Sequence, residues 1–214
     1  MKIFFGIVGQ IASGKGEVVK ILTEQHGFVS FNLSSILHKI LEEKRIVNFT
    51  RADLQDLGDK LRREEGEGVL AKRAITFLCH SERSEESNVG VGKIPRPTKK
   101  VELWMTSQKM IIEGIRNPAE VNYLRTLPNF KLIAVKAKKI IRFQRLIKRG
   151  KRWDPKTWDK FLVIDRRDKG LNQKKYGQQV GKCIKMADNI IQNNNNLEEL
   201  NSKIKKLLFS LSSS

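Results

Sequence analysis

A glycine-rich stretch near the start of the chain, Gly9–Gly16 with the sequence GQIASGKG, has the residue types and spacing of a phosphate-binding loop. The apolar run Ile3–Val8 before it predicts a buried strand, and residues 17–25 after it predict a helix. Gly9 and Gly14 allow the backbone to curl so that successive N–H groups point at an anion, and Lys15 can reach the terminal phosphates of a nucleotide. Strand, turn and helix together predict a P-loop.

The residue after the lysine departs from the usual pattern of such loops. A Ser or Thr usually stands there and its hydroxyl contacts Mg²⁺, whereas this chain has Gly16 followed by Glu17. The alternative interpretation is an ordinary glycine-rich turn with a surface lysine. The strand predicted just before the turn favours the P-loop.

Charged residues stand at the ends of other predicted elements. Glu113 ends the predicted strand 109–113, and Arg116 follows three residues later. In a parallel sheet the carboxyl ends of the strands meet at one edge, where ligands bind. The P-loop, Glu113 and Arg116 are therefore expected to lie together.

A basic helix is predicted over residues 140–149. Arg142, Arg145 and Arg149 share one face of it at spacings i, i+3 and i+7. A solvated helix face is the alternative. A later helix, predicted to start at Asp154-Pro155, contains Asp165-Arg166-Arg167-Asp168, and these four residues could instead form a surface ion-pair cluster.

Composition limits the class of protein. The chain has 214 residues, 39% of them hydrophobic, and a net charge of +19, which favours anionic partners such as nucleotides and also fits non-specific binding of nucleic acid. Cys79 and Cys183 are far apart, so neither a disulfide framework nor a zinc site is indicated. No apolar run is long enough to span a membrane and no signal peptide precedes the P-loop, so we expect a cytoplasmic protein without a membrane partner. The sequence does not indicate the oligomeric state.

Predicted strands alternate with predicted helices along the whole chain. This order predicts an α/β fold in three layers, α/β/α, with a mostly parallel five-stranded sheet. We expect one domain over residues 1–214.

Residues 79–100 interrupt this pattern because they contain almost nothing to bury. We expect a disordered surface insertion there. The string CHSERSEES resembles the peptide made when a mobile palindromic DNA repeat is translated within a bacterial gene, which implies a tolerated insertion without chemistry. An interaction loop is the alternative.

Several motifs resemble those of adenylate-kinase-like nucleoside monophosphate kinases and dephospho-coenzyme A kinases. The P-loop, the segment IIEGIR at 111–116, the RLIKR helix at 145–149 and the final predicted strand at 187–192 carry the likeness. The strongest overall resemblance is to an uncharacterised archaeal and bacterial branch of this group, in which GKGE, EGIR and DPKTW recur. The resemblance covers nearly the whole chain outside residues 79–100. It implies P-loop NTPase (nucleotide kinase) architecture, with a helical acceptor-binding lobe at 33–78 and a lid at 150–178.

The resemblance implies a role for each matching residue, with ATP and Mg²⁺ as cofactors. Lys15 would hold the donor phosphates, and Arg149, Arg166 and Arg167 would neutralise the transferring phosphoryl group. Glu113 would hold Mg²⁺ through water. The ATP-binding residues would be Gly9, Ala12, Ser13, Gly14, Lys15, Gly16, Glu17 and Arg145, with Arg145 stacked on the base. The acceptor-binding residues would be Arg116, Arg62, Arg51 and Gln55.

The acceptor itself depends on whether a carboxylate base is available. Phosphorylating a hydroxyl, as in dephospho-coenzyme A, benefits from a base near the acceptor, whereas a phosphate oxygen is already ionised at pH 7. Dephospho-coenzyme A kinases usually carry an aspartate after the second strand, but residues 29–41 contain no acid. We therefore expect a nucleoside or deoxynucleoside monophosphate as acceptor. The alternatives are a dephospho-coenzyme A kinase, a basic P-loop ATPase that acts on RNA or ribosomal particles, and a non-catalytic nucleotide-binding protein.

Overall fold

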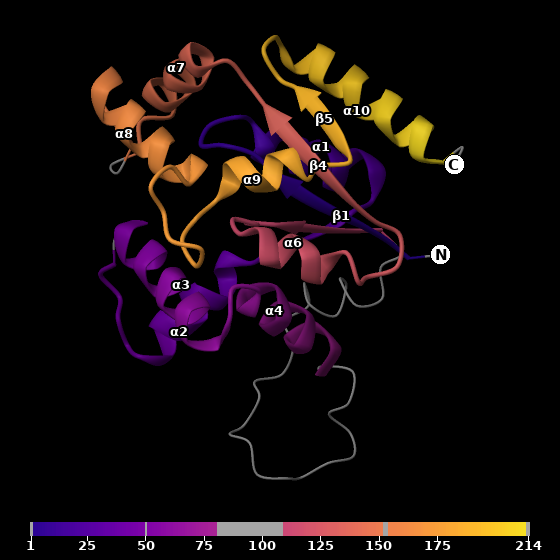
Figure 1. Cartoon of the computed structure of the whole chain (residues 1–214). Coiled ribbons are helices and arrows are strands. Elements are labelled where there is room, and N and C mark those ends of the chain that lie inside the picture. Colours follow the sequence, from indigo (N-terminus) through magenta and orange to yellow (C-terminus); the bar gives the residue numbers. More distant parts are fainter. Residues whose placement is uncertain (1, 50, 81–108, 152–153, 213–214) are drawn as a thin grey trace.

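The computed structural model describes residues 2–49, 51–80, 109–151 and 154–212 (Figure 1). Within them, five parallel strands form one sheet in the order β2-β3-β1-β4-β5. The strands are β1 (Ile3–Val8), β2 (Val29–Asn32), β3 (Lys109–Glu113), β4 (Phe130–Lys136) and β5 (Asn189–Gln192). The predicted α/β fold with a parallel five-stranded sheet is thereby confirmed.

Helices cover both faces of the sheet. The side chains of each strand alternate between the two faces, so both faces carry apolar side chains that helices bury. Phe5 and Ile133 belong to the cluster packed against α1 and α10, while Phe4 and Leu132 belong to the cluster packed against α2, α4, α6 and α9. The helices are α1 (Lys15–His26), α2 (Ser34–Glu43), α3 (Arg51–Glu65), α4 (Val69–His80), α6 (Pro118–Leu124), α7 (Lys139–Arg149), α8 (Trp158–Lys169), α9 (Val180–Lys185) and α10 (Leu197–Ser212).

The strand register brings the candidate site together. Ile7 near the end of β1 pairs with Glu113 at the end of β3, and Asn32 at the end of β2 pairs with the same residue. At this edge, helices α2 and α3 lie on one side and α7 and α8 on the other (Figure 1). Both helix pairs therefore lie near the carboxyl ends of the strands.

Two boundaries differ from those predicted. Helix α8 starts at Trp158 rather than at Asp154-Pro155, because the Thr157 hydroxyl caps it by accepting from the Lys160 N–H at 3.4 Å. Helix α4 extends to His80, two residues into the predicted insertion. The rest of that insertion, from residue 81 to 100, lies outside the described residues.

No helix in the described ranges combines the length and the apolar character needed to cross a membrane.

Candidate functional site

The P-loop between β1 and α1 requires glycine at two positions. Gly14 has φ +96°, and a Cβ there would lie 1.9 Å from Asn193 Nδ2. A Cβ on Gly9 would lie 2.4 Å from the Val135 carbonyl oxygen. The segments that contain Asn193 and Val135 therefore pack directly against the loop backbone. A residue larger than glycine at position 9 or 14 would push these segments away from the loop.

Lys15 folds back onto its own loop. Its Nζ donates to the carbonyl oxygens of Gly9 at 2.6 Å and Gln10 at 2.9 Å. The Ser13 carbonyl oxygen accepts from Arg145 Nη1 at 3.3 Å and from Asn193 Nδ2 at 3.0 Å. These contacts hold the loop in a curled shape, with the ammonium group at its mouth.

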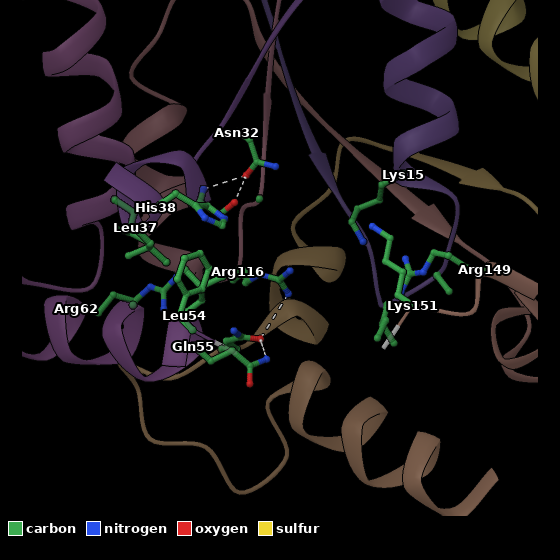
Figure 2. A pocket seen from close by; sticks show the side chains of 18 residues that line it. Lys15, Asn32, Leu37, His38, Leu54, Gln55, Arg62, Arg116, Arg149 and Lys151 are labelled. Carbon is green, nitrogen blue, oxygen red and sulfur yellow. Dashed lines mark hydrogen bonds between the residues drawn. The ribbon is translucent and has the colours of Figure 1, made fainter. Parts of the chain in front are cut away.

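A cavity of about 510 Å³ opens beside this loop and extends to helices α2 and α3. Figure 2 shows Lys15, Arg149 and Lys151 on one side of it, with Asn32, Leu37 and His38 across from them. Its lining is Ile11, Ala12, Lys15, Asn32, Ser34, Leu37, His38, Phe49, Leu54, Gln55, Gly58, Arg62, Leu70, Gly114, Arg116, Arg149, Lys151 and Gln178. Among these described residues there is no carboxylate. The lining contains cations both beside the P-loop, at Lys15 and Arg149, and beside α3, at Arg62.

Each arginine in the lining has a buried carboxylate behind it. The three carboxylates belong to Glu120, Asp168 and Asp154, which are 0%, 2% and 5% exposed. The pairs are Arg62–Glu120 at 2.9 Å, Arg116–Asp168 at 2.9 Å and Arg149–Asp154 at 2.6 Å. Such charge-assisted bonds fix the orientation of a guanidinium group. The cations are thus positioned before an anionic ligand arrives.

The predicted acceptor-binding residues have different surroundings. Arg116 and Gln55 line the cavity, and Gln178 Oε1 lies within 3.4 and 3.5 Å of their donor nitrogens. Arg62 also lines it but is only 3% exposed, and its nitrogens bond to Glu120 and to Asp59. The side chain of Arg51 lies outside the described residues.

Burial also affects Asp59, on the inner side of α3. Desolvation raises the pKa of this carboxyl above its ordinary value, although the nearby Arg62 and Arg167 oppose that shift. Arg62 thus pairs with one fully buried acid, Glu120, and one partly buried acid, Asp59, and helps to join α3 to α6.

Neither Arg166 nor Arg167 of α8 lines the cavity. Arg166 is exposed, and Arg167 forms an ion pair with Asp56 of α3 at 3.3 Å. The two acids that flank them, Asp165 and Asp168, face inward instead, because residues three apart share one side of a helix. The predicted cluster is thus split between two faces, and the roles given to its arginines stay predictions.

Glu113 lies at the end of β3 and is partly buried. Its carbonyl oxygen accepts from the Leu33 N–H at 2.8 Å, but the residue is not part of the cavity lining. No group of three or more metal-ligating side chains occurs in the described ranges.

A second cavity of about 280 Å³ lies on the other side of the P-loop. Burial lowers the pKa of Arg145 here, while Glu17 opposes that shift. Its lining is Gly14, Glu17, Arg145, Asn193, Asn195, Asn196, Leu197 and Leu200. The sequence signals Gly14, Glu17 and Arg145 but not the asparagines, because a run of asparagines after a strand is typical of any turn.

Comparisons with known proteins place this geometry in context. No family model matches the chain. In fold, it is similar to the crystal structure of TT1252 from Thermus thermophilus, at a TM-score of 0.56 with 19% identity and 98% of each chain covered. It is also similar to shikimate kinase from Bacteroides thetaiotaomicron, at a TM-score of 0.50 with 12% identity over 96% of this chain and 98% of that one.

These two likenesses concern the fold, and they agree with the predicted P-loop kinase architecture. In sequence, the chain is 30% identical over 205 residues to a UPF0200 protein of Pyrococcus horikoshii, with 94% of each chain covered. At that identity and coverage, the chain belongs to the UPF0200 family.

Proposed function

We propose that the protein is an ATP-dependent phosphotransferase whose acceptor is a nucleoside or deoxynucleoside monophosphate. The observation that carries the proposal is the cavity of about 510 Å³, which joins the P-loop to a compartment lined by cations and by no carboxylate among the described residues. Its size is in the range of about 300–1,000 Å³ that small-molecule sites occupy.

The donor nucleotide would bind along the P-loop. The backbone of Gly9–Glu17, including Ala12, Ser13 and Gly16, would surround its phosphates, with Lys15 at the terminal ones. Arg145 would stack on the base in the second cavity. Mg²⁺ would neutralise phosphate charge, with Glu113 as the water-mediated carboxylate, since Mg²⁺ is commonly held by one carboxylate and substrate phosphates.

The acceptor would bind in the larger cavity, with its phosphate at Arg116. Gln55 would contact the rest of the acceptor, and Arg62 would contribute positive charge from behind. The acceptor-binding role of Arg51 is kept as a proposal from the sequence alone.

The missing carboxylate favours a phosphate over a hydroxyl as the acceptor group. A hydroxyl would need a base, and Figure 2 shows His38 across the cavity from Lys15, which is a poor place from which to act at the reacting atoms. An ionised phosphate oxygen needs only alignment and charge neutralisation. Lys15, Arg149 and Arg116 would provide both. Arg166 and Arg167 would join them only if helix α8 rotated and brought these two side chains to the cavity.

An acceptor panel tests the proposal. Purified protein with Mg²⁺ and ATP labelled in its γ-phosphate is offered AMP, CMP, GMP, UMP, their deoxy forms, dephospho-coenzyme A, structured RNA, or no acceptor. We expect label in at least one nucleoside diphosphate, and a loss of at least about 10²-fold in Lys15→Met, because removing one transition-state donor typically costs that much.

Other results would select another function. Label in dephospho-coenzyme A alone would identify a hydroxyl kinase, and ATP hydrolysis stimulated only by RNA would identify an RNA-directed ATPase. ATP binding without any turnover would identify a nucleotide-binding protein.

A further inference from the structure

Two acids one turn apart on α8, Asp165 and Asp168, lie against the outer turn of the P-loop. Both are almost fully buried, at 1% and 2% exposure. Asp165 Oδ1 accepts from the Gln10 side-chain amide at 2.9 Å and from Arg142 Nη1 at 2.6 Å. Asp168 Oδ2 accepts from the backbone N–H of Ile11 at 2.9 Å. Helix α8 is thus attached to two consecutive residues of the loop.

Asp168 differs from Asp165 in the partner of its second oxygen. Its Oδ1 accepts from Arg116 Nη1 at 2.9 Å, and Arg116 lines the larger cavity. One carboxylate therefore connects a P-loop amide to the guanidinium group on the acceptor side. Asp165 has no contact of this kind with the cavity lining. Its arginine partner, Arg142, is only 1% exposed and does not line the cavity.

The helix that carries Asp168 is held in place independently of this bond. Ile11 of the P-loop, Leu146 of α7 and Phe161 of α8 form a buried apolar cluster between the three segments. The Arg142–Asp165 pair adds a buried ionic contact beside it. Asp168 is thus presented to Arg116 from a docked helix and not from a free chain segment.

We infer that Asp168 is a positioning residue that sets the distance and orientation between the donor phosphates on the P-loop and the acceptor phosphate at Arg116. The inference rests on the proposed function, in which those two groups bind the two substrates. Phosphoryl transfer depends on in-line alignment, and a displacement of 1 Å can cost on the order of 10²-fold in rate. Neither the P-loop motif nor the acceptor segment contains this aspartate.

If Asp168 instead competed with the substrate phosphate for Arg116, its removal would change the acceptor affinity in the opposite direction. A carboxylate that merely occupies a phosphate position would compete with the substrate, and its removal would tighten phosphate binding. A positioning carboxylate orients Arg116, and its removal weakens acceptor binding. The sign of the change in affinity therefore separates the two.

The test uses Asp168→Asn, which retains an oxygen for the Ile11 N–H and places an amide where Arg116 needs an acceptor. We expect the Kd of AMP and the KM of the acceptor to rise at least about 10-fold, with the Kd of ATP within about 3-fold, by calorimetry and steady-state kinetics. Arg116→Lys should give a similar loss. The double variant should lose little more than either single one, as residues acting as one unit do.

Asp165→Asn is the matched control. Asp165 lies on the same helix, is equally buried and also bonds to the P-loop, through the Gln10 side chain, but it has no bond to Arg116. This substitution should lower the melting temperature while leaving the ratio of AMP to ATP affinity within about 2-fold. Asp168→Glu keeps the charge but moves it by one methylene, and it should raise the acceptor KM even if Asp168→Asn does not fold.

Tighter AMP binding in Asp168→Asn, additive losses in the double variant, or equal changes in both Asp→Asn variants would overturn the inference. Its failure is distinct from that of the proposed function. Suppose that the wild-type protein binds AMP and that the substitutions change this binding as expected, but that no phosphate is transferred. That result would overturn the proposed function and leave the positioning role standing.

Discussion

The arginines that line the cavity show how single residues are prepared for an anionic ligand. Arg116 and Arg149 each have one buried acid behind them and keep 28% and 37% of their side chains exposed. Arg62, with two acids, is almost fully buried. The number of acidic partners thus separates arginines that can bind a ligand from one that mainly supports the fold.

Cys183 on α9 should be unreactive while the protein is folded. Burial, followed by the nearby charge of Glu120, raises the pKa of its thiol to about 12. Since the thiolate is the nucleophile, iodoacetamide at pH 8 should label the Cys183 peptide only after denaturant is added, as read by mass spectrometry. Rapid labelling in native buffer would contradict this.

The same shift predicts how stability depends on pH. In the unfolded chain this thiol loses its proton near pH 9, whereas in the folded protein it keeps the proton until about pH 12. The unfolded state therefore binds fewer protons in this window, and the contribution of Cys183 to the free energy of unfolding should fall as pH rises. Urea titrations between pH 8.5 and 10.5 should show a smaller fall in Cys183→Ser than in the wild type.

At the scale of elements, the P-loop depends on close contact with the segment after β5. Gly14→Ala should destabilise the protein by at least about 1–2 kcal/mol, because it forces a side chain into the left-handed region and against the Asn193 amide. Nucleotide binding should be lost with it. Thermal unfolding and ATP calorimetry provide the measurements.

Gly16→Ala is the control for that substitution. No atom lies within 4 Å of a Cβ at Gly16, which is in the first turn of α1 with an ordinary φ. It should be neutral or stabilising by up to about 1 kcal/mol, since alanine favours helices over glycine. Equal destabilisation by both variants would mean that the contact with Asn193 is unimportant.

Helix α3 is joined to helix α6 by the buried pair Arg62–Glu120. Glu120 also accepts from the backbone N–H groups of Arg116 at 2.8 Å and Asn117 at 3.1 Å. Glu120→Gln should cost about 3–5 kcal/mol of unfolding free energy, because it removes the fully buried counter-charge of Arg62 and leaves only the partly exposed Asp59. Glu65→Gln, which breaks the exposed pair with Arg73, should cost no more than about 1 kcal/mol. Urea denaturation of both variants would show whether burial accounts for the difference.

At the scale of the whole molecule, the cations that line the cavity account for only part of the net charge of +19. The proposed substrates are anionic, and a positive field speeds their approach and weakens with salt. The same field permits non-specific binding of nucleic acid. The salt dependence of turnover and of RNA affinity would show which partner it serves.

Replacing residues 81–100 by a short Gly/Ser linker tests the predicted insertion. This stretch has few apolar residues, and loop length costs little because each doubling adds only about 0.6 kcal/mol of closure entropy. The melting temperature should change by only a few degrees, and phosphate transfer should be retained. Loss of transfer with normal folding would favour the alternative of an interaction loop.

The sequence by itself determined the features that depend on local spacing. The P-loop at 9–16 follows from the spacing of its glycines and lysine, and the alternation of strands and helices follows from periods of 2 and 3.6 residues. The place of Glu113 at the end of β3, paired with Ile7 of β1, follows from the geometry of parallel sheets. These patterns persist because each element must bury its own apolar side, wherever it packs.

Only the tertiary structure decided which polar groups meet across elements. Gln10 and Asp165 are 155 positions apart in the chain, and Asn193 reaches Ser13 over 180. The resemblance gave Arg167 a role at the site, and the spacing suggested only a surface ion pair for Asp168, because a helix of known period can still dock on any of its faces. Docking is set by the combined packing of α7, α8 and the loop, and no local pattern records it.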